Sequence, residues 1–354
     1  MTDRFPGRPI PHSRPTLAGA DQEALADVVA SGFIAQGPRV AAFEREIASA
    51  LGVSGGVATS SGTAALHLAL LALDVGEGDE VLLPTYACAA LLHAVRAARA
   101  VPRLVDCDPA TFNVDPEAAR KACTPRTRAL VVVHSFGLPA DLDALSALGV
   151  PVIEDVAQAF GARDRDRPVG SVGAAAVLSF YATKLLTTGE GGMLVARDAR
   201  ILAAARDLRE YDQKAEDRPR FNYKMTDLQA ALGLAQLARF PAFLGRRQAL
   251  AALYRDRLAH LPLEHPPVRP DRGSVYYRYV VKGREPADRY LAGLMALGVE
   301  ARRPVFRPLH RYVGAEGFPG AEEAWARAVS LPLYPALTDD EACRVVDAAR
   351  QVFA

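Results

Sequence analysis

The 354-residue sequence contains few cysteines, and none of them is spaced as in a known cysteine framework. Cys88, Cys107, Cys123 and Cys343 are scattered, with no C-x-x-C pair among them. This spacing argues against a zinc ribbon and a disulfide framework, and it is typical of proteins kept in a reduced compartment. We therefore expect a cytoplasmic protein without a metal site.

The sequence also lacks an excess of charge and long apolar runs. Its 42 Lys+Arg and 41 Asp+Glu residues leave a formal net charge of +1, which argues against nucleic-acid binding and a polybasic membrane anchor. The longest apolar runs, AALHLALLAL and AALLHAV, are too short to cross a bilayer, and MTDRFPGRPIPHSRP lacks the apolar core of a signal peptide. We expect neither a nucleic acid nor a membrane as a partner.

Lysine is scarce, because only five of the 42 cationic residues are lysines. The protein uses arginine wherever a generic cation suffices. A lysine in an unusual context is therefore a candidate for amine chemistry, which arginine cannot perform.

What the sequence does contain is an alternation of short apolar runs and helical stretches between residues 55 and 196. This alternation predicts an α/β fold whose mostly parallel sheet is buried on both faces. We expect an arm over 1–20, a large domain over 21–245 and a smaller C-terminal α+β domain over 246–354. The candidate strands are 55–59, 80–84, 101–106, 128–134, 151–155, 175–180 and 192–196.

Three common ligand motifs are absent from this pattern. No G-x-G-x-x-G follows the first strand, and there is neither a G-x-x-x-x-G-K-[ST] loop nor a G-x-S-x-G elbow. The chemistry must therefore come from other segments, of which three stand out.

The first two segments lie where predicted strands end. In SSGTAALHLAL a strand enters a helix through Ser61, Gly62 and Thr63, and a helix N-terminus with a glycine suits a phosphate group. An ordinary Ser-capped helix is the alternative. In PVIEDVAQAFGA a strand ends in Glu154 and Asp155, where a carboxylate can pair with a cationic ring nitrogen or a metal. A helix cap or a surface charge is the alternative here.

The third segment, SFYATKLLTTGEGGMLV, places Lys184 in a short apolar and hydroxyl-rich connection between two strands. Partial burial would lower the pKa of its ammonium group and favour Schiff-base formation. A solvated loop lysine is the alternative. A phosphate cradle, a carboxylate and a Schiff-base lysine are together what pyridoxal 5'-phosphate (PLP) requires.

Several segments then resemble one family. SGTAALHLALLAL, DPATFNVDP, IEDVAQAFGA, SFYATKLLTTGEGG and FNYKMTDLQAALGLAQL are similar to the DegT/StrS-type PLP-dependent sugar aminotransferases, and the resemblance runs from about residue 11 to about residue 341. It implies a fold-type-I PLP enzyme with a mixed, mostly parallel seven-stranded sheet, a smaller C-terminal domain, and a homodimer with shared active sites.

The resemblance also implies roles for single residues. Lys184 matches the lysine that binds PLP covalently, Asp155 the partner of the pyridine nitrogen, and Gln158 the side chain near the PLP hydroxyl. Phosphate-binding positions are matched by Gly62, Thr63 and Ser179, and by Asn222, which would come from the partner subunit. Substrate positions are matched by Lys224, across the dimer, and by His310; Arg278 and Arg307 are further candidates for a substrate phosphate or the donor carboxylate.

Two positions depart from the family pattern. Cys88 stands where an aromatic side chain usually stacks on the PLP ring, with Tyr86 nearby but out of register; a buried packing role for Cys88 is the alternative. Leu185 follows the lysine, where the family often has asparagine. Both changes affect the shape of the pocket rather than a catalytic group.

The activity implied is the transfer of an amino group from an amino acid, glutamate by resemblance, to a keto-sugar carried on a nucleotide, in amino-sugar, polysaccharide or antibiotic biosynthesis. A keto-cyclitol acceptor and a non-catalytic protein that binds PLP or a sugar nucleotide are the alternatives. A sugar dehydratase is disfavoured, because family members of that kind carry histidine in place of Lys184.

Overall fold

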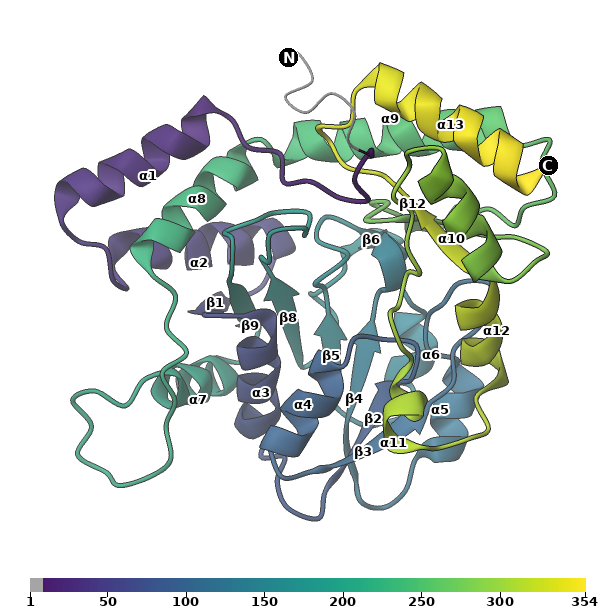
Figure 1. The fold of residues 1–354 in the computed structure, drawn as a ribbon. Helices are drawn as coiled ribbons and strands as arrows, with labels where there is room; N and C mark the ends of the chain where they lie inside the picture. The colour runs from purple at the N-terminus through teal and green to yellow at the C-terminus, as the bar shows by residue number, and fades with distance from the viewer. Residues whose placement is uncertain (1–8) are drawn as a thin grey trace.

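The computed structural model describes residues 9–354, whose centre is a seven-stranded sheet (Figure 1). The strand order is β1-β9-β8-β5-β4-β2-β3. Only β9 runs antiparallel to its neighbours, and the other pairs are parallel. The predicted mixed, mostly parallel sheet is therefore confirmed. Its strands are β1 (Gly55–Thr59), β2 (Glu80–Pro84), β3 (Val101–Val105), β4 (Thr127–Val133), β5 (Val152–Asp155), β8 (Ala175–Ser179) and β9 (Gly192–Ala196).

The apolar runs become strands because both faces of the sheet are covered by helices. In β4, Val131 and Val133 pack into one core, while Leu130 and Val132 pack into the core on the opposite face. The first face is covered by α3 (Gly62–Ala72), α4 (Ala90–Ala97) and α7 (Ala199–Arg209). The second face is covered by α2 (Pro38–Leu51), α5 (Pro116–Ala122), α6 (Leu142–Ser146) and α8 (Asp227–Ala238).

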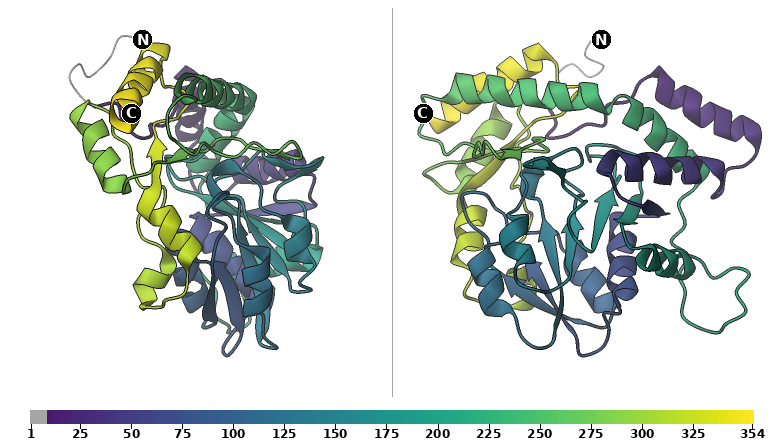
Figure 2. Two further views of the ribbon diagram at one scale, coloured as in Figure 1. Left: turned by 90° about the vertical axis from the view of Figure 1, so that its right-hand side faces the viewer. Right: turned by 180° about the vertical axis from the view of Figure 1, so that it is seen from behind.

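A second hydrophobic core gathers residues between Leu250 and Phe353 together with Ile10. The long helix α9 (Phe240–Leu258) runs along the top of the molecule and reaches both parts (Figure 2). The predicted boundary near residue 245 falls inside this helix, and the domain limits stay a prediction. The other elements of this part are β11 (Tyr279–Lys282), α10 (Ala287–Ala296), α11 (Leu309–Val313), α12 (Pro319–Arg327), β12 (Ala328–Leu331) and α13 (Asp339–Phe353).

Two pieces of structure, a short helix and a small sheet, were not expected from the sequence. A one-turn 3-10 helix, η1 (Ser135–Gly137), follows β4. A small antiparallel sheet joins β6 (Arg163–Asp164), β7 (Arg167–Pro168) and β10 (Arg272–Gly273). Helix α1 (Gly19–Ser31) and the loop over 210–226 both extend from the body on the same side (Figure 1).

Residues 9–18 form an arm that packs on the C-terminal core. The Ile10 N–H donates to the Gly298 carbonyl at 2.8 Å, and the Glu300 N–H donates to the Ile10 carbonyl at 2.9 Å. Further along the arm, His12 is buried and its Nε2 lies 2.8 Å from Ser330 Oγ. The arm is therefore tied to the C-terminal part by backbone and side-chain hydrogen bonds.

We predict that the buried His12 of this arm makes the free energy of unfolding decrease at acidic pH. Burial, together with the charges of Arg278 and Arg302, lowers the pKa of His12 from 6.5 to about 3. Between pH 6.5 and pH 3, His12 is protonated in the unfolded chain but stays neutral in the folded protein. The free energy of unfolding is therefore highest above pH 6.5 and falls as the pH is lowered toward 3. The slope is at most about 1.4 kcal/mol per pH unit.

Urea denaturation between pH 7 and pH 4 measures this dependence. The variant His12→Gln, which has no titrating group at this position, should show a shallower loss of stability with acid. Equal slopes for both proteins would contradict the role given to His12.

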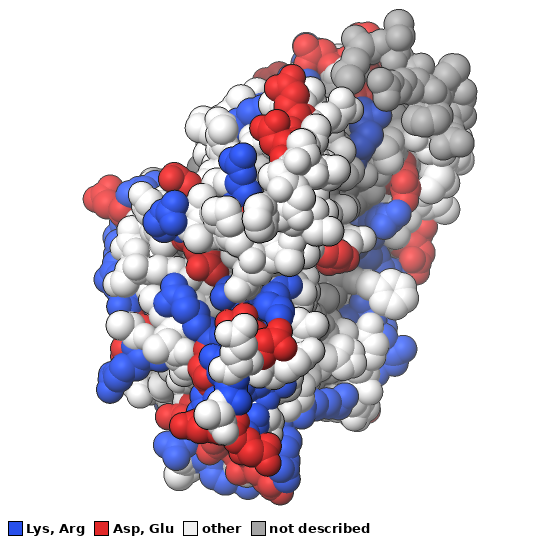
Figure 3. Space-filling view, turned by 90° about the vertical axis from the view of Figure 1, so that its left-hand side faces the viewer, with Lys and Arg blue, Asp and Glu red and all other residues white. Residues whose placement is uncertain are grey.

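The visible charges do not segregate by sign. Figure 3 shows lysine and arginine intermixed with aspartate and glutamate over the face that carries α1 and the 210–226 loop. Among the described residues, no helix has the length and apolar character needed to cross a membrane. The cytoplasmic location expected from the cysteines, which are all free thiols, stays a prediction.

Candidate active site

A cavity of about 300 Å³ lies where β5 and β8 end and α3 begins. Parallel strands bring the groups at their carboxyl ends to one edge of the sheet, which explains why residues from distant segments meet here. Eight of the residues singled out in the sequence line this cavity: Ser61, Gly62, Thr63, Cys88, Asp155, Gln158, Ser179 and Lys184.

The start of α3 forms one end of the cavity. Ser61 caps the helix, with its Oγ accepting the Ala64 N–H at 3.1 Å. The N–H groups of Gly62 and Thr63 have no acceptor within the helix and are available to an anion. Gly62 is required here because a Cβ at this position would lie 2.9 Å from the Ser179 Cβ. Helix and strand thus approach closely enough for Thr63 and Ser179 to face one ligand.

Asp155 also lines the cavity and is almost completely buried. Burial raises the pKa of this carboxyl group, although the Ala157 N–H, which donates to Oδ1 at 2.9 Å, and the charge of Lys184 act in the opposite direction. A buried carboxylate with one hydrogen bond is stabilised by a cationic partner. Asp155 therefore fits the protonated ring nitrogen of PLP.

Glu154, the preceding residue, points into the protein and has a different role. Its Oε1 accepts the N–H groups of Val172 and Gly173, and its Oε2 accepts those of Gly170 and the His134 imidazole, all between 2.7 and 3.1 Å. Burial alone would raise the pKa of Glu154, but the hydrogen bonds from His134 and the backbone hold it below its ordinary value. Of the two carboxylates, only Asp155 belongs to the cavity.

Lys184 is half-buried in the turn that follows β8, with its N–H donating to the Tyr181 carbonyl at 2.9 Å. Its Nζ lies 5.3 Å from the centre of the Tyr277 ring. Within residues 9–354, no carboxylate oxygen lies within 4 Å of this Nζ. The amine is thus not committed to an ion pair in the described part of the chain.

Gln158 and Cys88 also line the cavity. Gln158 Oε1 accepts the Phe136 N–H at 3.0 Å, which leaves its NH₂ group free to donate to a ligand. Cys88 is exposed and lines the cavity, whereas Tyr86 is buried and stacks on Phe112. The structure therefore brings the thiol, and not the nearby tyrosine, into this cavity, and a place for Cys88 over the PLP ring stays a prediction.

Other residues predicted from the sequence do not reach this cavity in their own chain. Asn222 is exposed in the 210–226 loop, where the adjacent Tyr223 carbonyl accepts the Ser60 N–H. In the same loop, Lys224 pairs with Asp212 at 2.9 Å. His310 and Arg307 line a different cavity of about 620 Å³, and Arg278 lines a third.

His310 is also committed to hydrogen bonds within the chain. Its Nδ1 lies 2.8 Å from Thr85 Oγ1, and its Nε2 lies 2.5 Å from Glu322 Oε1. The imidazole is buried and stacks on Phe318. These contacts fix the ring in place, and a role toward substrate stays a prediction.

Sequence reasoning missed Tyr181, Glu190 and Tyr277. Tyr181 and Glu190 line the cavity, and Tyr277 contacts Lys184 from a segment almost one hundred residues away. The position of Tyr181, three residues before Lys184, was a local signal that could have been used. No local motif marks Tyr277, because its place at the site results from packing between the two parts of the molecule.

The residues of the cavity fit PLP in charge and in shape. Free helix N–H groups suit a phosphate, the buried Asp155 suits a cationic ring nitrogen, and Lys184 has an amine within reach of the same space. The close approach at Gly62 leaves no room for a larger side chain beside the anion site. The cavity is thus suited to PLP, and Lys184 would hold the cofactor.

Comparison with known proteins agrees with this chemistry. The profile described as the DegT/DnrJ/EryC1/StrS aminotransferase family matches residues 15–350. GDP-perosamine synthase of Caulobacter vibrioides is 35% identical, over 96% of this chain and 96% of that protein. A crystal structure of DesV from S. venezuelae is 38% identical, with a TM-score of 0.89 over 94% of this chain and 93% of that one.

A structure of Spr1654 from Streptococcus pneumoniae in its PLP-form superimposes with a TM-score of 0.92 at 25% identity, over 98% of this chain and 100% of that one. The family resemblance seen in the sequence is thereby confirmed. The chain is an aminotransferase that belongs to the DegT/DnrJ/EryC1/StrS family.

Proposed function

We propose that this enzyme transfers the amino group of L-glutamate to a keto-sugar linked to a nucleotide, with PLP in the cavity beside Lys184. The convergence of Lys184, Asp155 and the α3 N-terminus in one cavity supports this proposal most directly. The relatives support the sugar acceptor, because one is named for a GDP-linked sugar. The product would serve amino-sugar, polysaccharide or antibiotic biosynthesis.

Each residue has a distinct part in the proposed reaction. PLP, when bound, accepts the electron pair released as the donor loses its α-proton. Lys184 takes that proton from the α-carbon of the donor as a general base. It then returns a proton, as a general acid, to the cofactor carbon that carries the transferred nitrogen. Asp155 would keep the ring nitrogen protonated, and the Gly62 and Thr63 N–H groups with the Ser179 hydroxyl would hold the phosphate. Gln158 would donate to the ring hydroxyl, and Cys88 would face the ring.

A homodimer with shared active sites is part of the proposal. Val29, Phe33 and Ile34 expose 63%, 76% and 51% of their surfaces at the end of α1, which is unusual for large apolar side chains unless a partner covers them. The 210–226 loop extends on the same side (Figure 1). We propose that this loop brings Asn222 to the phosphate and Lys224 to the substrate of the partner subunit. Arg307 and His310 remain proposed substrate residues.

Two spectroscopic steps test the function. The purified protein, reconstituted with PLP, should be yellow and should lose that absorption when L-glutamate is added, with release of one 2-oxo acid per site. The aminated protein should then regain the yellow absorption with one member of a panel of nucleotide-linked 3-keto and 4-keto sugars.

Recovery with a keto-cyclitol instead of any keto-sugar would support the alternative acceptor and contradict the proposal. A protein that binds PLP but never changes its absorption with an amino donor would be a binding protein, not a catalyst. Lys121→Ala, which removes an exposed lysine of α5, provides a control for unspecific PLP attachment.

A further inference from the structure

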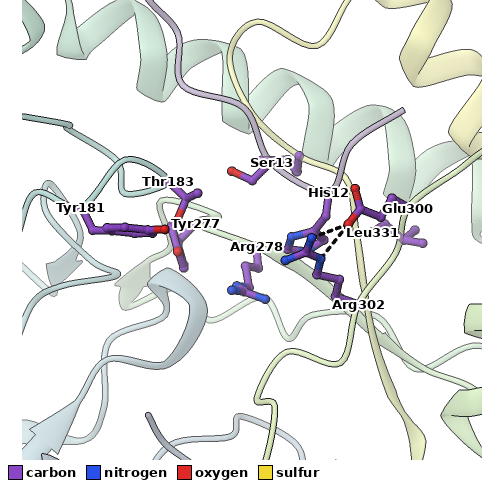
Figure 4. A pocket seen from close by; sticks show the side chains of 10 residues that line it. His12, Ser13, Tyr181, Thr183, Tyr277, Arg278, Glu300, Arg302 and Leu331 are labelled. Atoms are coloured by element: carbon purple, nitrogen blue, oxygen red, sulfur yellow. Dashed lines mark hydrogen bonds and ion pairs between the residues drawn. The ribbon is translucent and has the colours of Figure 1, made fainter. Parts of the chain in front are cut away.

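A second cavity of about 330 Å³ adjoins the proposed PLP cavity (Figure 4). Tyr181 lines both cavities, and Thr183 in the second precedes Lys184 in the first. The wall away from Lys184 is built by the arm, which contributes His12 and Ser13, and by the C-terminal part. The second cavity therefore opens beside the reactive amine, on the side facing the C-terminal part.

This second cavity carries an excess of positive charge. Its charged lining residues are Arg278, Arg302 and Glu300, and Arg302 Nε donates to Glu300 Oε1 at 3.0 Å, as the dashed lines in Figure 4 show. Arg278 has no carboxylate oxygen within 4 Å among residues 9–354. His12 is held neutral, as its lowered pKa indicates. One guanidinium group thus has no opposite charge in the described part of the chain.

Arg278 and Lys184 both lie close to the ring of Tyr277. The Arg278 Cζ lies 5.4 Å from the centre of the Tyr277 ring, and the Lys184 Nζ lies 5.3 Å from the same centre. The two cations are therefore no farther apart than the sum of these distances. Although burial would raise it, the charges of Lys184 and Arg278 lower the pKa of the Tyr277 hydroxyl to about 8. Both cations therefore act on the same buried tyrosine, which lies beside both cavities.

The backbone of Arg278 is anchored to the PLP cavity. Its N–H donates to the Phe136 carbonyl at 3.4 Å, and the Phe136 N–H donates to Gln158 Oε1. On the other side, Tyr279 begins β11, which pairs with β12 of the C-terminal part. Arg278 thus lies at the junction of the two parts. These contacts fix the position of its backbone relative to Gln158 and Lys184.

We propose that Arg278 binds a carboxylate of the amino-acid donor in this second cavity while the donor's amine lies at Lys184. A guanidinium group forms two parallel hydrogen bonds with a carboxylate, which fixes both the position and the orientation of the donor. The polar neighbours His12 and Ser13 allow the carboxylate to keep further hydrogen bonds. The inference rests on the proposed aminotransfer, but it concerns the donor and not the sugar.

The test measures binding of glutarate, a dicarboxylate without an amino group, to the PLP-loaded enzyme by calorimetry. Loss of a charge-assisted contact in Arg278→Met should raise the dissociation constant about ten- to a hundred-fold. Arg278→Lys should recover part of the affinity, and Arg99→Met, which removes an exposed arginine paired with Glu77, should leave it unchanged. Circular dichroism confirms that each variant is folded.

Single-turnover kinetics separates the carboxylate from a sugar phosphate. In Arg278→Met the step with glutamate should slow at low donor concentration, whereas the step of the aminated enzyme with its keto acceptor should be unchanged. Glutarate affinity equal to that of the wild type, no glutarate binding by the wild type, or a defect confined to the acceptor step would each overturn the assignment. If no keto-sugar is accepted but glutarate binding falls as expected, the proposed acceptor is wrong and the donor site stands.

Discussion

Lys184→Ala is expected to abolish amino transfer and to leave a folded protein. Lys184 is the group proposed to move the proton, and such a group contributes up to about four orders of magnitude in rate. We therefore expect turnover to fall at least about a thousand-fold. The fold should persist because Nζ faces a ring and forms no ion pair with a described carboxylate, so its removal breaks no salt bridge.

The measurement combines activity with mass spectrometry. After borohydride treatment, the wild type should carry one PLP-derived mass on the peptide that contains Lys184, and the variant should carry none. Lys184→Arg should also be inactive, because guanidinium remains protonated and is a poor nucleophile. Ordinary turnover by Lys184→Ala, or a trapped adduct on another lysine, would refute the assignment.

Glu154→Gln is expected to cause the largest loss of stability. All acceptor positions of this buried carboxylate are used, two by Val172 and Gly173 and two by Gly170 and His134. Glutamine would turn an NH₂ group toward one pair of donors. His134 cannot relieve the conflict by changing tautomer, because its Nδ1 accepts the Ala140 N–H. Breaking a buried network of this kind costs about 3 to 5 kcal/mol.

Chemical denaturation of the cofactor-free protein measures this loss, and the adjacent residue provides a matched control. Asp155 accepts only the Ala157 N–H among the described hydrogen bonds, and its raised pKa shows that burial already disfavours its charge. Asp155→Asn should therefore cost much less stability but should weaken PLP-dependent activity. Equal stability losses for the two variants would contradict the division of roles between the neighbouring carboxylates.

The sheet was predictable because its strands are apolar on both faces. Continuous apolar runs such as residues 128–134 and 192–196 are expected where both faces of a strand are buried, and they form β4 and β9. The two-residue strands β6, β7 and β10 have the sequences RD, RP and RG, which carry no periodicity. They pair only because their flanking segments are already held in place.

The candidate site was predictable where it depends on local motifs. Gly62, Asp155 and Lys184 each end or follow a strand of the sheet, so topology alone brings them together. Glu154 could not be distinguished from Asp155, because its partners come from residues 134 and 170–173. The approach of Tyr277 likewise depends on the packing of the C-terminal part, which no motif records.

The place of the arm has a practical consequence for recombinant work. The family profile begins at residue 15, so a fragment cut to that boundary would omit Ile10, His12 and Ser13. It would lose the hydrogen bonds to Gly298 and Glu300 and would open one wall of the second cavity to solvent. Expression clones intended for kinetic work should therefore retain the segment upstream of the profile.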